Sequence, residues 1–432
     1  MKGRRVVVTG VGLVSPCGST LDDLGEALFR GRSAAAPIRR FPAASFGIGV
    51  AAQVPDEEWT RARTDPQARG FLLADDAKSA WGVLAARRAL ADARFPEWRP
   101  DPERIAISIG TGLSSVTRAE LEEDLLGAVA ADATIDMESV GRSVAARGTW
   151  SPWRHLTDGL NRRLAEIAEA SGRSVSHFGA CAASTQAIGD GYRMVREYAA
   201  DVAIVGGADS MVHPFGLVSF LLLGALGKDE LPQRTCKPFH RSRNGFLLGE
   251  GACFLVLEDH RAASERGARM LAEIVGYGSS CDGYNLTAPR PDGAGAAAAM
   301  RAALDDAKLA PERIGWVNAH GTGTELNDPA EANAMRSVFG GHAGKVPISS
   351  VKPVTGHLVA AAGAIEVASC LAAFRADRIP HTANLDPADV DPECRGLLHL
   401  CTPMDGCPEL VMTNNYGFGG QNASLILKRV DE

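Results

Sequence analysis

Short apolar runs and amphipathic helical patterns alternate along this chain, and the alternation occurs twice in a similar order. In the first series, strands are predicted over 5–9, 105–109, 202–206 and 253–258, and helices over 76–93 and 185–199. Alternating elements of these two kinds are typical of an α/β protein. The sequence therefore predicts an α/β fold.

The second series predicts a further set of elements in a similar order. Its strands are expected over 272–277, 316–319, 347–350, 410–414 and 423–429, and its helices over 294–307, 329–339 and 357–373. We expect an N-terminal half over 1–258 and a C-terminal half over 259–432. A chain of 432 residues, 45% of them hydrophobic, is long enough to bury a large core.

One cysteine lies among small residues just before the helical pattern over 185–199, in the segment Phe178-Gly179-Ala180-Cys181-Ala182. A helix start leaves backbone N–H groups unpaired and carries partial positive charge, which favours thiolate over thiol. Small neighbours leave the sulfur accessible. Cys181 is a candidate nucleophile, although a cysteine is more often a small packed apolar residue.

Two histidines lie in matching contexts, each beside a glycine after an apolar run that predicts a buried strand. His320 follows the predicted strand 316–319 and precedes Gly321, and His357 follows the predicted strand 347–350 and Gly356. Glycines permit tight turns that carry such side chains off a strand end. Together with Cys181, these histidines predict an active site.

Five ordered motifs resemble the β-ketoacyl-acyl-carrier-protein synthases, and fit the elongating ketosynthases best. They are carried by Cys181, His320, Lys352, His357 and the segment Asn414-Asn415-Tyr416-Gly417-Phe418-Gly419-Gly420. The resemblance runs nearly end to end. It implies the thiolase fold, a five-layered αβαβα arrangement of two pseudo-repeated halves, usually as a homodimer.

The resemblance implies a decarboxylative Claisen condensation in fatty-acid, polyketide or polyene biosynthesis. Cys181 would take an acyl group from an acyl carrier protein, with the backbone N–H groups of Cys181 and Phe418 as the oxyanion hole. A malonyl thioester would then lose carbon dioxide, and His320 and His357 would stabilise the enolate charge. The resulting carbanion would attack the acyl group and give a β-ketoacyl product.

Four further roles in this hypothesis fall to Lys352, Glu366, Phe418 and Asp282. A buried lysine needs a partner, and we expect a Lys352–Glu366 ion pair behind His357 that positions this histidine. Phe418 is also a candidate gate for acyl chains, and Asp282 lies in a loop that the family places near the pocket entrance. We expect no metal, because no C-x-x-C pair is present, and no other cofactor.

Some segments depart from the family pattern. His240 and Asn244 stand where the family commonly has aspartates, and the stretch 114–172, with Trp150 and Trp153, is the least similar. We expect that stretch to help shape the acyl pocket and the dimer contact. The chain length and the primer are therefore not predicted.

Three alternatives keep the same scaffold. A thiolase would have a second cysteine near the C-terminal loop, where this chain has Asn414 to Phe418 instead. An acyltransferase would keep Cys181 without needing both histidines. A non-catalytic partner subunit that sets chain length would lack the cysteine, whereas a catalytic subunit that depends on such a partner stays open.

Composition and charge exclude other classes. Gly10 and Gly12 suggest a dinucleotide-binding turn, but the third glycine is misplaced and Pro16 disrupts the helix entry. A net charge of −7 without a basic run argues against nucleic acid. We expect no run long and apolar enough to span a bilayer, and the nine irregularly spaced cysteines indicate reduced thiols in the cytoplasm.

The acidic balance also bears on the expected partner. Acyl carrier proteins are usually acidic, so docking on this chain needs a local basic patch. Arg61, Arg63, Arg69 and Lys78 are the candidates.

Overall fold

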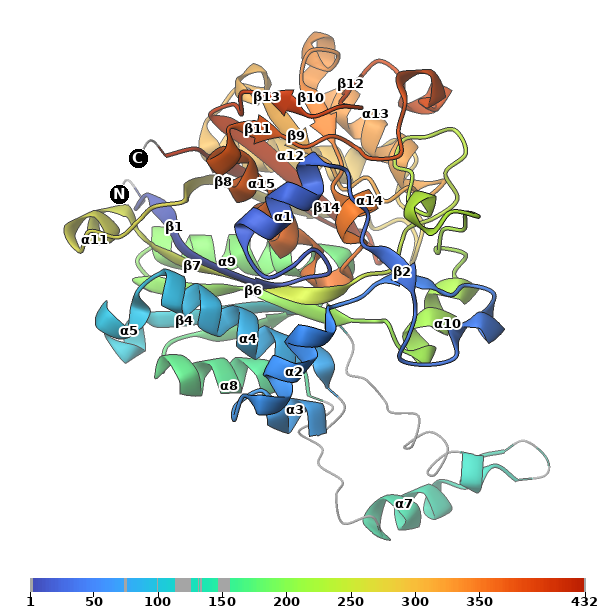
Figure 1. The fold of residues 1–432 in the computed structure, drawn as a ribbon. Coiled ribbons are helices and arrows are strands. Elements are labelled where there is room, and N and C mark those ends of the chain that lie inside the picture. The colour runs from blue at the N-terminus through green and yellow to red at the C-terminus, as the bar shows by residue number, and fades with distance from the viewer. Residues whose placement is uncertain are drawn as a thin grey trace.

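Eleven strands form one continuous mixed sheet that runs through the molecule, and helices cover it in layers (Figure 1). The computed structural model describes residues 3–73, 76–98, 100–112, 126–130, 132, 134–146 and 156–430. Much of the dissimilar stretch 114–172, including Trp150 and Trp153, lies outside these residues. Its expected part in the acyl pocket stays a prediction.

The sheet is built from two runs of strands. In spatial order they are β5 (Ser174–His177), β4 (Ile105–Thr111), β6 (Val202–Ser210), β7 (Glu250–Asp259), β1 (Val6–Val14), β8 (Ala272–Cys281), β15 (Gln421–Lys428), β14 (Leu410–Gly417), β9 (Trp316–Asn318), β10 (Pro347–Ser349) and β12 (Leu398–His399). Strands of the first predicted series thus lie on one side, and those of the second on the other.

The two runs repeat one topology. The order β1-β7-β6-β4-β5 has two antiparallel pairings followed by two parallel ones, and β8-β15-β14-β9-β10 has the same pairings in the same sequence. The runs join where β1 and β8 pair antiparallel. This repeat confirms the two related halves, whereas the exact boundary at 258/259 stays a prediction.

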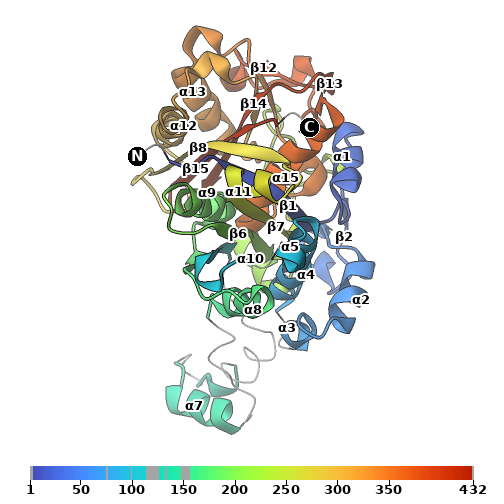
Figure 2. The same ribbon diagram turned by 90° about the vertical axis from the view of Figure 1, so that its left-hand side faces the viewer.

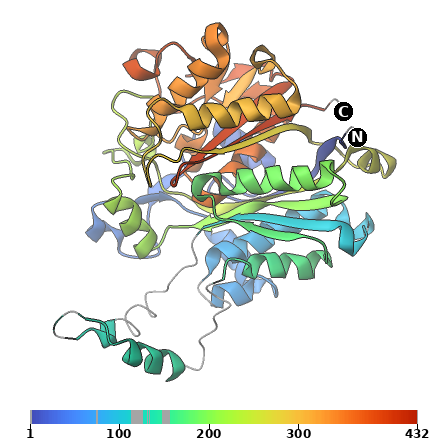
Figure 3. The same ribbon diagram turned by 180° about the vertical axis from the view of Figure 1, so that it is seen from behind.

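Six helices complete the layers (Figures 2 and 3). Helices α4 (Ala77–Asp92) and α8 (Gly159–Ala168) cover the outer face of the first run of strands, and α12 (Ala294–Ala307) and α13 (Asn327–Phe339) cover that of the second. Between the two runs lie α9 (Ala183–Arg196) and α15 (Ala362–Ala376), which contact each other. The five-layered αβαβα arrangement is therefore confirmed.

The remaining elements are short or peripheral. They are α1 (Leu21–Phe29), α2 (Asp56–Thr64), α3 (Arg69–Leu73), α5 (Phe95–Trp98), α7 (Met137–Ala146), α10 (Pro214–Leu222), α11 (His260–Glu265), α14 (Lys352–Thr355), β2 (Ala35–Pro37), β3 (Val50–Ala52), β11 (Arg378–Ile379) and β13 (Met404–Asp405). Helix α7 stands away from the layered body in all three views.

The stretch Val359–Ala376 corrects one expectation from the sequence. Among the described residues it is long and apolar enough to cross a membrane by length and composition, although we expected no such run. In the structure 89% of this stretch is buried, because it contains α15 in the middle layer. Core helices that are apolar on all sides pass the same test.

Paired glycines set the close contact between strand and outer helix in both halves. A Cβ atom on Gly12 of β1 would lie 2.1 Å from the carbonyl oxygen of Ala85 in α4, and one on Gly278 of β8 would lie 2.1 Å from that of Ala299 in α12. Gly10 and Gly276 meet the same helices in the same way. The glycines of the Gly10-Val11-Gly12 motif therefore allow α4 to pack closely on β1, and they do not form a nucleotide-binding turn.

We expect Gly278→Ala to lower the free energy of unfolding by about 3 kcal/mol, because α12 must move away from β8 to admit the methyl group. Urea denaturation followed by circular dichroism measures the change. The matched control is Gly341→Ala, since a Cβ there meets no atom within 4 Å. Equal stability of the two variants would contradict this account of the contact.

Candidate active site

Cys181 lies in a tight turn at the start of α9. The turn is a short 3-10 helix over Ala180–Ala182, and Ala180 has φ +47°, a left-handed conformation that residues with a Cβ rarely adopt. The turn redirects the chain between β5 and α9, so that Cys181 faces the interior and is only 6% exposed. The helix begins two residues earlier than the sequence indicated.

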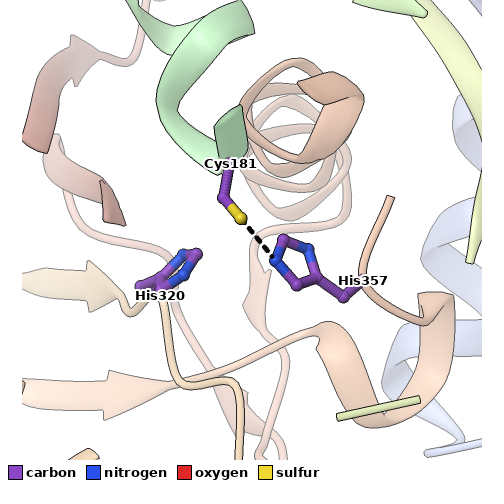
Figure 4. A group of neighbouring side chains, drawn as sticks. All are labelled: Cys181, His320 and His357. Atoms are coloured by element: carbon purple, nitrogen blue, oxygen red, sulfur yellow. Dashed lines mark hydrogen bonds between the residues drawn. The ribbon is translucent and has the colours of Figure 1, made fainter. Parts of the chain in front are cut away.

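His357 lies beside a turn of the same kind in the other half. A 3-10 helix over Val359–Ala361 precedes α15, and Val359 has φ +46°. The predicted helix over 357–373 therefore begins only at Ala362. Because α9 and α15 lie together in the middle layer, the two turns meet, and His357 Nε2 lies 3.0 Å from Cys181 Sγ (Figure 4).

His320 reaches the same point from the end of β9. Its ring centroid lies 5.5 Å from that of His357, with the two planes at 85°. One potential ligand atom from each of Cys181, His320 and His357 lies within 4.8 Å of the other two. The structure thus brings together the three residues that the sequence singled out, each from a separate segment.

Both imidazoles direct an N–H group into the site. The Nδ1 atom of His357 accepts a hydrogen bond from the backbone N–H of Val359 at 3.3 Å, and Lys352 Nζ lies 3.2 Å from Nδ1 of His320. A backbone N–H group and an ammonium group can only donate, so each Nδ1 atom is an acceptor. The hydrogen of each neutral ring is therefore on Nε2. Burial, helped by the positive charge of Lys352, lowers the pKa of both histidines well below the usual value.

This arrangement disfavours a metal ion, although one thiol and two imidazoles are suitable ligands. Coordination through Nε2 would require the hydrogen on Nδ1. On His357 that hydrogen would point at the backbone N–H of Val359, and on His320 it would point at the ammonium group of Lys352. The three side chains are better suited to donate hydrogen bonds than to bind a cation.

Lys352 and Glu366 form the expected ion pair, but beside a different histidine. Both side chains are 1% exposed, and Nζ of Lys352 contacts Glu366 Oε1 together with Nδ1 and the carbonyl oxygen of His320. Asn415 Nδ2 donates to Glu366 Oε2 at 2.9 Å. The expected place behind His357 is therefore wrong, since the pair orients His320.

The thiol of Cys181 corrects another expectation. Burial, the largest influence, raises its pKa to about 12, and Lys352 lowers it only in part. Backbone N–H groups of Phe418 and of Cys181 itself also donate to the sulfur and lower the pKa. The backbone donors at the helix start therefore act in the predicted direction, but burial outweighs them, and the resting group is a thiol beside a neutral imidazole.

The loop after β14 supplies the second backbone donor. Phe418 is half-buried, packs against the apolar cluster that contains Cys181, and lies 6.4 Å from Phe220 between ring centroids. A Cβ on Gly417 would lie 2.7 Å from the carbonyl oxygen of Gly179 and 3.0 Å from the backbone nitrogen of Cys181. Glycine at 417 is therefore what allows the N–H of Phe418 to approach the sulfur.

Asp282 braces this loop rather than facing the sulfur. Its carboxylate accepts hydrogen bonds from Asn422 Nδ2 at 2.8 Å and from the backbone of Arg290 at 3.0 Å, while its own N–H donates to Gly420. Asp282 also lines the cavity above the site. It fixes the shape of the entrance by joining two loops.

Two buried carboxylates near the site were not predicted from the sequence. Glu331 accepts hydrogen bonds from the backbone N–H groups of His320 and Gly321, both at 2.8 Å, and burial raises its pKa to about 8. Asp209 accepts from the backbone N–H of Ala360 at 2.9 Å, next to Val359. Each thus fixes the loop or turn that positions one histidine.

A cavity of about 330 Å³ leads from the surface to Cys181, His320 and His357. Its walls include Phe246, whose ring lies 4.9 Å from that of His357, and Asn244, one of the residues that departs from the family pattern. Asn244 exchanges hydrogen bonds with the backbone of Lys228. His240, the other departure, is buried with Nε2 3.5 Å from Asp389 and lies outside the cavity wall.

Known proteins resemble this chain along nearly its whole length. Residues 3–263 match the model of the β-ketoacyl synthase N-terminal domain, and residues 271–386 match that of the C-terminal domain. The 3-oxoacyl-[acyl-carrier-protein] synthase 2 of Coxiella burnetii is 34% identical over 439 residues, which cover 100% of both chains.

Two solved structures share the fold over 99% of this chain and 100% of theirs, each with a TM-score of 0.83. One is the ishigamide ketosynthase/chain length factor, at 33% identity, and the other is a type II polyketide acyl carrier protein in complex with its ketosynthase, at 27% identity. The architecture is thus the thiolase fold of the ketosynthases.

The chain belongs to the β-ketoacyl synthase family. It is an acyltransferase of the ketosynthase class that elongates acyl chains in fatty-acid or polyketide biosynthesis.

We expect Lys352→Met to lower the free energy of unfolding by about 3–5 kcal/mol, because it leaves the carboxylate of Glu366 buried without a cation. The double variant Lys352→Met/Glu366→Leu should recover all but about 1–2 kcal/mol, the cost of the hydrogen bond that Asn415 loses. Chemical denaturation measures both. A double variant no more stable than the single one would contradict the buried-pair account.

Proposed function

We propose that Cys181, His320 and His357 divide the condensation between one nucleophile and two hydrogen-bond donors. In the first step Cys181 Sγ attacks the carbonyl carbon of an acyl thioester on an acyl carrier protein. The bond to the carrier sulfur breaks, and the proton of Cys181 passes to that sulfur. Backbone N–H groups of Cys181 and Phe418 stabilise the oxyanion during this transfer.

In the second step a malonyl thioester on a carrier enters the same cavity. Its carbon–carboxylate bond breaks, carbon dioxide leaves, and the electron pair becomes an enolate on the thioester oxygen. The Nε2–H groups of His320 and His357 donate to that oxygen. The enolate carbon then bonds to the acyl carbon on Cys181, the carbon–sulfur bond breaks, and the proton needed by Sγ comes from solvent.

The observation that supports this proposal best is the tautomer of the two histidines. Val359 and Lys352 occupy both Nδ1 atoms, so two neutral donors converge beside one sulfur. Neutral donors suit a reaction that develops negative charge in a buried site, because the site then does not have to hold a charged donor before the reaction begins. Lys352 and Glu366 act as positioning residues for His320, and Phe418 also acts as a gate.

We expect Cys181→Ala to abolish covalent loading while the protein stays folded. Intact-protein mass after incubation with a panel of acyl carrier protein thioesters measures the gain of one acyl group. Loading at another site in the variant would overturn the assignment of the nucleophile. If no donor loads the unmodified chain, a required partner subunit or a different carrier is indicated instead.

We expect His320→Ala to load an acyl group but to lose condensation, because loading needs only Sγ and the backbone donors. The loss should be at least about 10²-fold, the usual effect of removing one oxyanion donor. Product formation from malonyl carrier protein by the preloaded variant measures it. Unimpaired condensation would refute the role assigned to His320.

The proposal includes a second subunit, either a copy of this chain or a related one. Among the solved relatives, the ishigamide ketosynthase occurs with a chain length factor. In this chain β5 is the last strand of the sheet, and its outer edge pairs with no strand among the residues that the structure describes. An edge of this kind favours pairing with another subunit.

We also propose a cytoplasmic location. All nine cysteines are unpaired, and several of them, including Cys253 and Cys370, are buried in the core. Free thiols in this number suit a reducing compartment. A carrier-dependent pathway of acyl elongation is consistent with that setting.

A further inference from the structure

A second, much smaller space adjoins the catalytic cavity. Its volume is about 10 Å³, close to the minimum that holds one water molecule. Its walls come from the loop 282–290, from the starts of α12 and α13, and from the hairpin of β14 and β15. It shares with the wall of the large cavity the residues Asp282, Pro289, Asn327, Tyr416 and Asn422. We call this space the side chamber.

Tyr416 brings an unpaired hydroxyl group to the side chamber. The residue is 8% exposed, and its hydroxyl group has no hydrogen-bond partner among the residues that the structure describes. On β14 the side chain of Asn415 faces the middle layer, so that of Tyr416 faces the outer layer and its apolar cluster around α12 and α13. A buried hydroxyl group without a partner is destabilising. The position of Tyr416 therefore indicates a polar ligand in the side chamber.

Glu331 brings a second hydrogen-bond donor to the same wall. Burial raises its pKa to about 8, so at neutral pH its carboxyl group keeps a proton and has one O–H donor. The bonds of Glu331 to the backbone N–H groups of His320 and Gly321 use its oxygens as acceptors, so neither bond takes this proton. A ligand of the side chamber therefore has two O–H groups from which to accept.

Asp282 supplies an acceptor for the same ligand. Its carboxylate already accepts from Asn422 and from the backbone of Arg290, but a carboxylate can accept about four hydrogen bonds. Burial, followed by the charges of Glu331 and Asp282, raises the pKa of Tyr416 well above its usual value. Tyr416 therefore keeps its proton, and both carboxyl groups are close enough to act on its hydroxyl group.

We infer that the side chamber binds one water molecule, which accepts from the hydroxyl group of Tyr416 and the carboxyl group of Glu331 and donates to the carboxylate of Asp282. Two O–H donors and one acceptor match a water molecule, which accepts two hydrogen bonds and donates two. A metal ion is a poorer match, because at neutral pH only one of the two carboxyl groups is ionised.

This water makes Tyr416 a positioning residue for both catalytic loops. Glu331 holds the backbone of His320, and the backbone N–H of Asp282 donates to Gly420, two residues after Phe418. The water joins these two supports through Tyr416, so the Nε2–H of His320 and the N–H of Phe418 are held in one frame. This role rests on the proposed function, whereas the water site itself does not.

Crystal structures that resolve ordered water, of the full chain and of Tyr416→Phe, test the site directly. We expect one water molecule within about 3 Å of Tyr416 Oη and of both carboxyl groups in the unmodified chain, and its loss in the variant. An ion in its place, no ordered water there, or a water that stays unchanged in Tyr416→Phe would overturn the inference.

The sign of the stability change is a second test. We expect Tyr416→Phe to lower the midpoint of urea denaturation, because the hydroxyl group loses a hydrogen-bonded partner. A hydroxyl group without a partner would give the opposite sign, since its removal is stabilising, and a raised midpoint would therefore refute the water site. The matched control is Tyr284→Phe on the neighbouring loop, which should leave the midpoint unchanged because Tyr284 is 57% exposed.

Condensation kinetics separate positioning from stability alone. We expect Tyr416→Phe to lower kcat about fivefold, the equivalent of one hydrogen bond, while the KM for malonyl carrier protein stays unchanged. An unchanged kcat, or a change in KM alone, would refute the positioning role. If the unmodified chain forms no β-ketoacyl product, the proposed function fails, and the crystal structures and the urea midpoint still decide the water site.

Discussion

The packing of α9 against α15 between the two runs of strands is the constraint on which the active site depends. Each helix begins in a 3-10 turn, one that contains Cys181 and one that starts two residues after His357. The distance from sulfur to imidazole is therefore set by how two buried helices lie together, rather than by a flexible loop. His320, from the end of β9, completes a site to which both halves contribute.

The groups of the active site carry almost no net charge before the reaction begins. Burial favours neutral imidazoles and a neutral thiol, and the charge of Lys352 is matched by the carboxylate of Glu366. The hydrogen-bond donors are fixed by backbone and by the ion pair before any substrate arrives. Such preorganised dipoles in a water-poor site stabilise developing charge more strongly than they would in water.

Local sequence patterns predicted much of the fold and the three central residues of the site. The alternation of elements indicated an α/β fold with two halves, and the helix over 294–307 coincides with α12. Cys181, His320 and His357 were found because each lies between a strand pattern and a helix pattern. The residue types and their setting were sufficient to indicate a site, and the resemblance to ketosynthases supplied the reaction.

The features that were missed depend on contacts between distant segments. Strand β6 continues past 206 to Ser210 because its backbone pairs with β7 as far as Glu250, and the carboxylate of Asp209 at its end accepts a hydrogen bond from Ala360, 151 residues away. Likewise, the position of Lys352 beside His320 depends on the short helix α14, which has no clear pattern of its own. The pKa of Cys181 also could not be predicted, because burial by the whole fold outweighs the helix start.

Ala180 and Val359 show what it costs to build such a site. A residue with a Cβ in the left-handed region costs roughly 1–2 kcal/mol, and more is expected for a branched side chain such as valine. The chain keeps both strained residues at the two turns that bring sulfur and imidazole together. The two turns thus lower the stability of the fold but keep the sulfur and the imidazole aligned. Substitutions selected for stability alone would remove this strain first, and the alignment that catalysis requires would be lost.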